Sequence, residues 1–241
     1  MKPWLKLDSS DVPDGSDQLQ LWQRDAEFSI RLKRGGELMN SRAFASERAL
    51  ADLICPRLAD RATPRVLVGG LGLGHTLAAA LAGLPTEAEV VVAELSPAVV
   101  RWNRGPLAHL ASHPLLDARV QVHVGDVGAL LRQPGRRWDA VLLDVDNGPE
   151  GLTRDDNDWL YSTSGLTTTA RSLRPGGVLG VWSAHPSPAF RRRLQATGLS
   201  VEEHQARARA ATGSVGSAGA NKRGAGGKGP RHIVWLATAA M

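Results

Sequence analysis

Residues 65–81, RVLVGGLGLGHTLAAAL, decide how this 241-residue chain is expected to fold. The stretch begins with a short β-branched apolar run, which is typical of a buried strand. It ends with alanines and leucines, which favour a helix. Glycines stand between the two, where they permit positive φ angles and a close approach of the backbone. A strand, a glycine turn and a helix N-terminus can bind a nucleotide-type ligand; a turn that binds nothing is the alternative.

Apolar runs and helix-forming segments alternate along the chain beyond this stretch. Such alternation predicts an α/β fold with a parallel sheet and helices on both of its faces. Two final strands joined only by a loop predict a closing antiparallel hairpin. Seven strands are therefore expected, at 65–70, 88–95, 119–126, 137–146, 177–184, 199–208 and 231–239.

The part before this sheet divides into two segments. Residues 1–17 are expected to be a flexible leader. Residues 18–45 are expected to form a small β-hairpin extension around Gly35 and Gly36, because apolar and polar positions alternate there. The main domain then covers 46–241, and its Gly-, Ala- and Ser-rich segment 210–230 is expected to be a disordered basic loop.

Composition excludes several classes of protein. A single cysteine, Cys55, excludes an internal disulfide framework and a thiolate metal cluster. Of the seven histidines only His109 and His113 stand four apart, and Pro114 suggests that a helix ends there, so no metal is expected. No apolar run reaches the roughly 18 residues that a membrane span needs, and the N-terminus carries no secretory h-region. We therefore expect a cytoplasmic protein without a membrane partner.

The net charge of +5 is unevenly distributed. Residues 171–231 hold eleven Lys or Arg against two acids, whereas the rest of the chain has 18 basic and 22 acidic residues. Binding to nucleic acid is one interpretation of this basic excess. The segment 207–231 has no aromatic residues that could stack on bases, which favours a solvated basic loop and no nucleic-acid partner.

Acidic residues follow three of the expected strands. Parallel strands place their carboxyl ends at one edge of a sheet, where ligands bind. Glu94 follows the glycine turn by about 20 residues, the spacing of an acid that binds ribose hydroxyls. Asp126 can accept a hydrogen bond from an adenine amino group or can simply cap the next helix. Together with Asp144, these acids predict an adenosine site, although each alone is compatible with a solvated loop carboxylate.

The motifs VLVGGLGLG, VVVAELSP, RVQVHVGD, WDAVLLDVDNGP and LRPGGVLGVWS occur in this order. They resemble the motifs of class I S-adenosylmethionine-dependent transferases, and within that group most closely those of the spermidine synthase (polyamine aminopropyltransferase) family, over roughly residues 20–240. The resemblance implies the class I methyltransferase (Rossmann-like) sheet, an N-terminal β extension and a homodimer. It implies a donor, S-adenosylmethionine or its decarboxylated form, and a small-molecule amine acceptor.

The resemblance also implies roles for individual residues. Asp144 would be catalytic, beside the reacting sulfonium and the incoming amine, which a carboxylate holds and helps to deprotonate. The residues implied to bind the donor are Gly70, Gly72 and Gly74 under its methionine part, Glu94 at the ribose, and Asp126 with the backbone of Val127 at the adenine. The residues assigned to the acceptor are Asp146, Asn147, Trp159 and Tyr161. The two aromatic residues could wall a methylene channel or simply anchor the loop to the core.

The sequence departs from the family pattern at three places. Leu73 stands where the family has an acid in the glycine turn, and Asn147 stands where it has a second Asp. Of the family's Tyr-His-Glu cluster only Glu47 remains. The loss of the acid in the turn would suit a donor that keeps its carboxylate, which is ordinary S-adenosylmethionine.

An acidic segment favours a cationic acceptor. Residues 139–158 hold seven acids and one base, and a negative potential over the site would attract an amine. A solvated acidic loop is the alternative. Three functions stay open at this point: a spermidine synthase-like transferase that moves an aminopropyl or related alkyl group to an amine, an S-adenosylmethionine-dependent methyltransferase, and a non-catalytic nucleotide-fold protein that acts by association.

Overall fold

The computed structural model describes residues 2–42, 45–135, 137–145, 149, 158–207 and 231–241. The predictions for Asp146, Asn147 and the segment 210–230 lie outside these residues. So do most of the acids of the predicted acidic segment.

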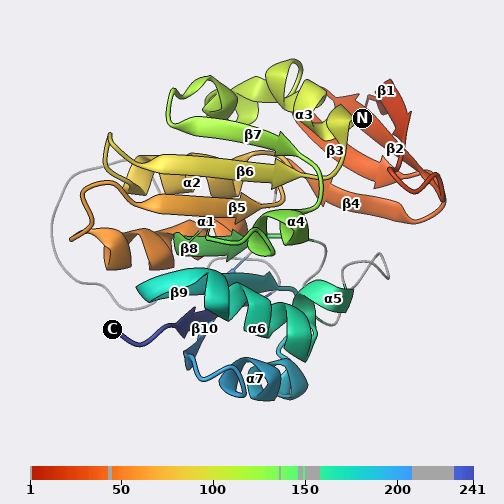
Figure 1. Cartoon of the computed structure of the whole chain (residues 1–241). Helices are drawn as coiled ribbons and strands as arrows, with labels where there is room; N and C mark the ends of the chain where they lie inside the picture. Colours follow the sequence, from red (N-terminus) through yellow and green to blue (C-terminus); the bar gives the residue numbers. More distant parts are fainter. Residues whose placement is uncertain (1, 43–44, 136, 146–148, 150–157, 208–230) are drawn as a thin grey trace, which may run out of the picture.

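The main sheet has seven strands in the order β10-β11-β9-β8-β5-β6-β7 (Figure 1). Strands β5 to β9 pair in parallel, and β11 pairs antiparallel with both β9 and β10. This confirms the α/β fold with a closing antiparallel hairpin. The strand bounds are β5 Arg65–Gly69, β6 Glu89–Glu94, β7 Val120–Val124, β8 Trp138–Leu143, β9 Leu173–Ser183, β10 Ser200–Arg207 and β11 Arg231–Thr238.

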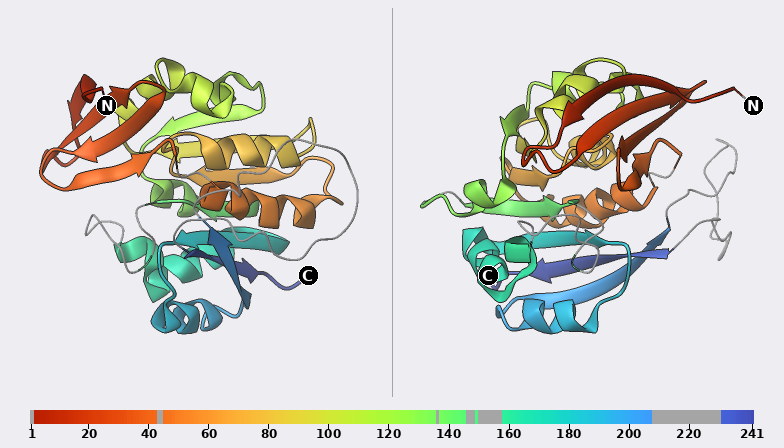
Figure 2. Two further views of the ribbon diagram at one scale, coloured as in Figure 1. Left: turned by 180° about the vertical axis from the view of Figure 1, so that it is seen from behind. Right: turned by 90° about the vertical axis from the view of Figure 1, so that its right-hand side faces the viewer.

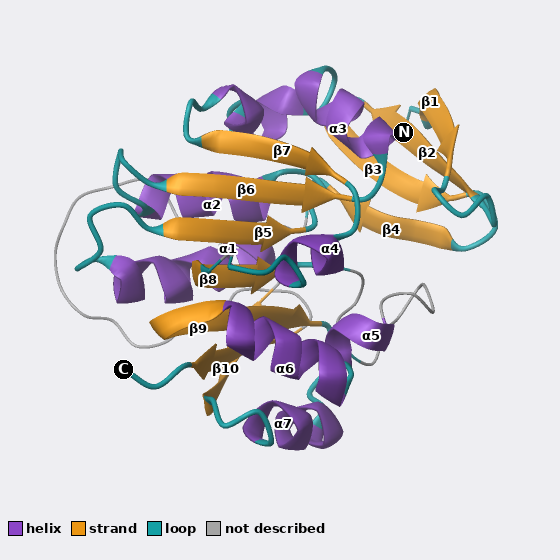
Figure 3. Ribbon diagram, viewed as in Figure 1, coloured by secondary structure: helices purple, strands orange, loops and turns teal. Residues whose placement is uncertain are grey.

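Helices cover both faces of this sheet (Figure 3). One core contains side chains of α1, α2 and α3, and a second contains side chains of α4, α6 and α7. Because each of the central strands is buried on both faces, their sequences are nearly continuous apolar runs. The helices are α1 Ala45–Ile54, α2 His75–Gly83, α3 Pro97–Arg104, α4 Val127–Leu131, α5 Asp158–Tyr161, α6 Thr163–Ser172 and α7 Pro188–Gln195, with short 3₁₀ turns at Cys55–Leu58, Ala108–Ala111 and Pro114–Leu116.

A second, antiparallel sheet precedes the main domain and lies beside the carboxyl ends of β5, β6 and β7 (Figures 1 and 2). Its strands pair in chain order, β1 Leu5–Asp11, β2 Gln18–Arg24, β3 Glu27–Leu32 and β4 Gly36–Asn40. The predicted flexible leader is therefore corrected, since residues 5–11 pair with β2. The predicted hairpin is likewise extended to three strands, because the chain turns at Asp25 as well as at Gly36.

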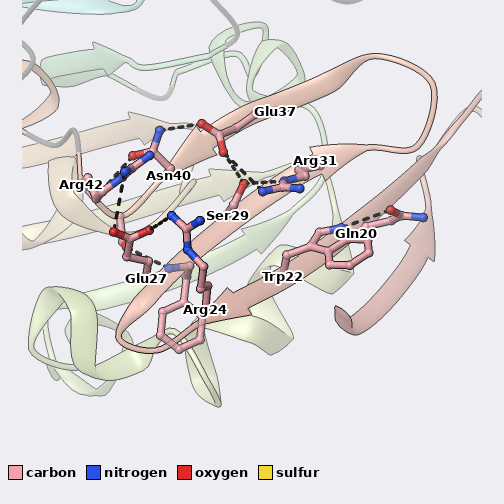
Figure 4. A network of polar contacts seen from close by, with 11 residues as sticks. Gln20, Trp22, Arg24, Glu27, Ser29, Arg31, Glu37, Asn40 and Arg42 are labelled. Carbon is pink, nitrogen blue, oxygen red and sulfur yellow. Dashed lines mark hydrogen bonds and ion pairs between the residues drawn. The ribbon is translucent and has the colours of Figure 1, made fainter. Parts of the chain in front are cut away.

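The two faces of this N-terminal sheet differ. Leu21, Phe28 and Ile30 point inward and are buried in the first core. The other face carries a polar network, drawn in Figure 4, in which the Glu37 carboxylate accepts hydrogen bonds from Ser29 and Asn40. Since strand side chains alternate between faces, the buried aliphatic side chains gather on the inward face. That face is the one available to cover the strand ends of the main sheet.

The boundary between α6 and β9 lies at a different residue from the one predicted. The segment GLTTTARSLRPGG at 165–177 has the pattern of a helix that is ended by Pro175 and two glycines. The structure ends α6 at Ser172, and β9 begins at Leu173 with the Pro-Gly-Gly inside it. The pairing of β8 with β9 shifts register between Trp138 and Ala140, so this irregular start of the strand accommodates the proline.

Asp139 is correctly placed in β8 but does not belong to the site. It lies near the amino end of the strand, fully buried, and Arg61 and Arg174 contact its two carboxylate oxygens at 2.6 and 2.8 Å. The backbone N–H of Arg65 donates to it as well. Its charge is thus compensated at the opposite end of the sheet, and the prediction that it adds to a negative potential over the site is corrected.

Candidate active site

The carboxyl ends of the strands meet at a cavity of about 420 Å³, a size common for small-molecule sites. One wall comes from the main sheet and its loops, and the other from the inward face of the N-terminal sheet. Of the residues predicted from the sequence, the cavity is lined by Gly70, Gly72, Glu94, Asp126, Val127 and Asp144.

The glycine turn is held between β6 and β8. The N–H of Gly70 donates to the carbonyl of Ala93, and the N–H of Asp144 donates to the carbonyl of Gly69, each at 2.9 Å. Gly70 has a φ of 90°, and a Cβ there would collide with the carbonyl oxygen of Asp144. Glycine is therefore required at this position, because the turn runs directly against the end of β8.

Gly72 and Gly74 also have positive φ angles but differ in place. Gly72 lines the cavity beneath the side chain of Met39 from β4. Gly74 caps α2 and packs near Asn103, and it is not among the residues that line the cavity. Leu73, between them, is buried in the core.

Glu94 is fixed at the end of β6 by backbone donors. Its two carboxylate oxygens accept hydrogen bonds from the N–H groups of Leu71 and Ser96, at 3.0 and 2.8 Å. Burial raises the pKa of Glu94, while these backbone hydrogen bonds oppose the rise. Each carboxylate oxygen can accept a second hydrogen bond, so Glu94 still has acceptor sites for a ligand in the cavity.

Asp126 caps a helix and lines the cavity at the same time. Its carboxylate accepts the N–H of Gly128 at 2.8 Å, as an N-cap of α4, and pairs with Arg132 at 3.0 Å. Asp126 therefore does cap the helix, as the simpler interpretation predicted. Val127, the first residue of α4, lines the cavity beside it.

Asp144 follows β8 and lies against the glycine turn. Its carboxylate accepts a hydrogen bond of 2.5 Å from the hydroxyl of Thr76, a buried residue in the first turn of α2. Burial raises the pKa of Asp144 to about 6, and the hydrogen bond from Thr76 opposes this rise. Such a carboxyl can exchange a proton near neutral pH.

Glu47 and Thr76 are features that the motif analysis did not assign to the site. Glu47 lies in the first turn of α1, and its carbonyl is 3.3 Å from the hydroxyl of Thr76. Burial and the nearby charge of Asp144 raise the pKa of Glu47 well above its usual range. In the sequence, Glu47 could have been noticed because it matches one residue of the family's Tyr-His-Glu cluster. No pattern in the sequence pointed to Thr76.

Trp159 and Tyr161 lie behind the cavity rather than along it. The hydroxyl of Tyr161 donates to the carbonyl of Val145 at 3.1 Å, and its ring meets the edge of Phe190. Trp159 carries the guanidinium of Arg132 over its ring, 4.3 Å from the centroid. These contacts favour the anchoring alternative, since Tyr161 holds Val145 and both aromatic residues pack in or against the second core.

The wall from the N-terminal sheet was not predicted as part of the site. Its lining residues are mostly apolar, with Asp14, Ser16 and Asp17 in the loop after β1. The full set is Val12, Pro13, Asp14, Ser16, Asp17, Leu19, Ile30, Leu32, Leu38 and Met39. Within the described residues, no group of three His, Cys, Asp or Glu side chains could hold a metal ion. Nor does any helix of this part of the chain combine the length and apolar character needed to cross a membrane.

Sequence comparisons agree with this geometry. The model of the spermine/spermidine synthase domain matches residues 48–191. A polyamine aminopropyltransferase of Mycobacterium tuberculosis (strain H37Rv) is 33% identical over 144 residues, which are 58% of this chain and 26% of that protein. Another, from Nitrosomonas europaea, is 32% identical over 133 residues, 55% of this chain and 38% of that protein. The match thus spans well under half the length of these relatives.

Solved structures share the fold. The crystal structure of spermidine synthase from Thermotoga maritima aligns with a TM-score of 0.68 at 14% identity, over 97% of this chain and 72% of that chain. A spermidine synthase in complex with the transition state analogue AdoDATO aligns with a TM-score of 0.67 at 13% identity, again over 97% and 72%. At such identities the likeness shows a common fold.

Proposed function

Because this chain belongs to the spermine/spermidine synthase family, we propose that it transfers an aminopropyl group from an adenosyl sulfonium to an amine. The observation that carries the proposal is the position of Asp144. It stands beside the glycine turn in the same cavity as Glu94 and Asp126, at the ends of neighbouring strands.

In this proposal the donor lies along the strand ends. Glu94 accepts hydrogen bonds from the ribose hydroxyls through its remaining lone pairs. Asp126 and Val127 bind the adenine, and Gly70 and Gly72 leave room for the chain that carries the sulfonium. The apolar side chains of the N-terminal sheet cover the donor and exclude water. Binding both reactants in one cavity supplies much of the catalysis, because displacement at carbon depends on their alignment.

Asp144 supplies the proton chemistry. A primary ammonium gives one proton to the Asp144 carboxylate and becomes a neutral amine. Its nitrogen lone pair then forms the new N–C bond at the carbon next to sulfur. The C–S bond breaks with its electron pair on sulfur, so the donor leaves as a neutral thioether and the product is a secondary ammonium.

Methyl transfer from ordinary S-adenosylmethionine is the second candidate, and Leu73 is the observation that favours it. Leu73 is buried in the core, and the side chain above Gly72 is the thioether of Met39. Residues 70–74 of the glycine turn therefore supply no carboxylate for a donor amine, which suits a donor that keeps its own carboxylate.

Calorimetry with three adenosyl compounds tests which donor fits. We expect the decarboxylated donor and 5′-methylthioadenosine to bind, and S-adenosylmethionine to bind more weakly, since its carboxylate adds a negative charge beside Asp144. A clear preference for S-adenosylmethionine would support methyl transfer instead. Binding of none of the three would favour the third function, a non-catalytic protein that acts by association.

Glu94→Gln is expected to weaken the binding of 5′-methylthioadenosine about tenfold to a hundredfold, as the loss of a charged hydrogen-bond acceptor implies. The amide nitrogen would also face a backbone N–H of Leu71 or Ser96. Calorimetry measures the effect. The matched control is Glu89→Gln, at the exposed amino end of the same strand, which should leave the affinity unchanged; equal affinities in both variants would remove Glu94 from the donor site.

A homodimer and a cytoplasmic location stay predictions. Light scattering of the purified chain checks the first, and fractionation of cells checks the second. The proposed acceptor is a small-molecule amine, for which the acids near the cavity are suited by their charge.

A further inference from the structure

Thr76 on α2 holds the side chain of Asp144. It is the second residue of the helix and only 2% exposed. Its hydroxyl donates to Oδ2 of Asp144 at 2.5 Å, a length usual for a hydroxyl bound to a carboxylate. The carbonyl of Glu47 lies farther from the same hydroxyl, at 3.3 Å. Because a hydroxyl has one proton to donate, the shorter contact shows that Thr76 serves Asp144.

Asp144 is thus fixed at two points, one in its backbone and one in its side chain. Its N–H donates to the carbonyl of Gly69, which ties the end of β8 to the glycine turn. The hydroxyl of Thr76 then sets the orientation of the carboxylate. Within the described part of the chain, Oδ1 has no hydrogen-bond partner, and Asp144 lines the cavity. Oδ1 is therefore the oxygen left to accept from a ligand.

The titratable groups around Asp144 do not replace this contact. Glu47 on α1 is itself an acid, and burial and the charge of Asp144 raise its pKa well above the usual range. His75 on α2 has its pKa lowered to about 4 by burial and by the charge of Arg48, so it is uncharged at pH 7. Neither group brings a positive charge to Asp144. Burial raises the pKa of Asp144, and the hydrogen bond from Thr76 is the contact that opposes this rise.

We propose that Thr76 is a positioning residue of the transferase: its hydroxyl fixes the orientation of Asp144, occupies Oδ2 and leaves Oδ1 to take the proton of the acceptor amine. The proposal rests on the proposed function, because the proton comes from that amine. The proton passes from the ammonium nitrogen to Oδ1, while the hydroxyl keeps its own proton and its bond to Oδ2. A carboxylate free to rotate would spend less time aligned with the amine, and misalignment lowers the rate.

Thr76→Val and Thr76→Ser separate the hydroxyl from the rest of the side chain. Valine has a similar shape without the hydroxyl, and serine keeps the hydroxyl. We expect Thr76→Val to lower kcat about tenfold to a hundredfold, the effect of losing a hydrogen bond to a charged group. The loss should persist on the alkaline plateau of the pH profile. The acid limb should also move to higher pH, because the ionised form of Asp144 loses a donor. Thr76→Ser should restore both features.

Thr169→Val is the matched control. Thr169 is fully buried on α6, and its hydroxyl donates to the carbonyl of Gly165 at 3.0 Å. It is not among the residues that line the cavity, so its loss should leave kcat and the acid limb unchanged. Affinity for 5′-methylthioadenosine, measured by calorimetry, should be unchanged in all three variants. A plateau rate in Thr76→Val equal to that of wild type, or a Thr76→Ser as slow as Thr76→Val, would overturn the proposal.

The hold of Thr76 on Asp144 is also tested without substrates, by nuclear magnetic resonance of protein isotope-labelled at the carboxyl carbons of aspartate. The signal that disappears in Asp144→Asn identifies Asp144. In wild type and Thr76→Ser it should titrate near the pKa of about 6, and in Thr76→Val at higher pH. Identical titrations in the three proteins would overturn the proposal. If wild type transfers no aminopropyl group, the proposed function fails and the role in transfer with it, whereas the titrations still decide whether Thr76 holds Asp144.

Discussion

Asp144→Asn is expected to lower the rate of aminopropyl transfer by roughly 10²–10⁴-fold, the usual contribution of a general base. An amide of the same shape can still accept the hydrogen bond from Thr76, so the cavity keeps its form. It cannot take a proton from an ammonium, however, and the amine stays unreactive. Turnover measured with the decarboxylated donor and a diamine gives the effect.

Donor affinity is the control for this variant. Calorimetry with 5′-methylthioadenosine should show nearly unchanged binding, because Asp144 acts on the acceptor amine. In wild type, the rate should fall as the pH drops below about 6, where the carboxylate of Asp144 becomes protonated. Turnover that survives in Asp144→Asn would remove the residue from its role.

Gly70→Ala is expected to have the largest effect on the donor site. Its φ of 90° is strained for alanine, and the new methyl group would meet the carbonyl oxygen of Asp144. The turn and the end of β8 must then separate, so we expect the free energy of unfolding to fall by about 2–4 kcal/mol. Denaturant unfolding measures this loss, and calorimetry should show that 5′-methylthioadenosine no longer binds at the original affinity.

Gly36→Ala separates the effect of backbone strain from the effect of the contact between the new methyl group and its neighbours. Gly36 has a similar φ of 83°, but a Cβ there would meet nothing within 4 Å. Only the backbone strain remains, so a loss of about 1 kcal/mol is expected, with donor affinity unchanged. If the two variants are equally stable and bind equally well, the close approach of Gly70 to Asp144 is not what shapes the site.

Much of the fold could be predicted because local sequence specifies it. Strands β5, β6 and β8 are apolar runs with turn signals at their ends, and parallel pairing brings those ends together. Strand β1 was missed because Leu5 and Leu7 stay exposed, so no buried face marks it as a strand. Backbone pairing with β2 holds it in place, and the sequence does not display such pairing.

The candidate site could be predicted only in part, for similar reasons. Glu94, Asp126 and Asp144 each end a strand, and that rule places them at one edge of the sheet. Asp139 is also an acid in β8, but its partner Arg61 lies far away in the sequence. The structural role of Asp139 could therefore not be predicted from the sequence. Thr76 contacts Asp144, and the packing of α1 against α2 brings the backbone of Glu47 to Thr76, which no spacing rule reveals.

The most direct test of the central claim is to identify what the purified chain makes. Incubated with decarboxylated S-adenosylmethionine labelled in its aminopropyl group and with 1,4-diaminobutane, it should yield a labelled triamine and 5′-methylthioadenosine in equal amounts, as seen by mass spectrometry. Unchanged donor and diamine, from protein that is folded and binds no adenosyl compound, would contradict the account.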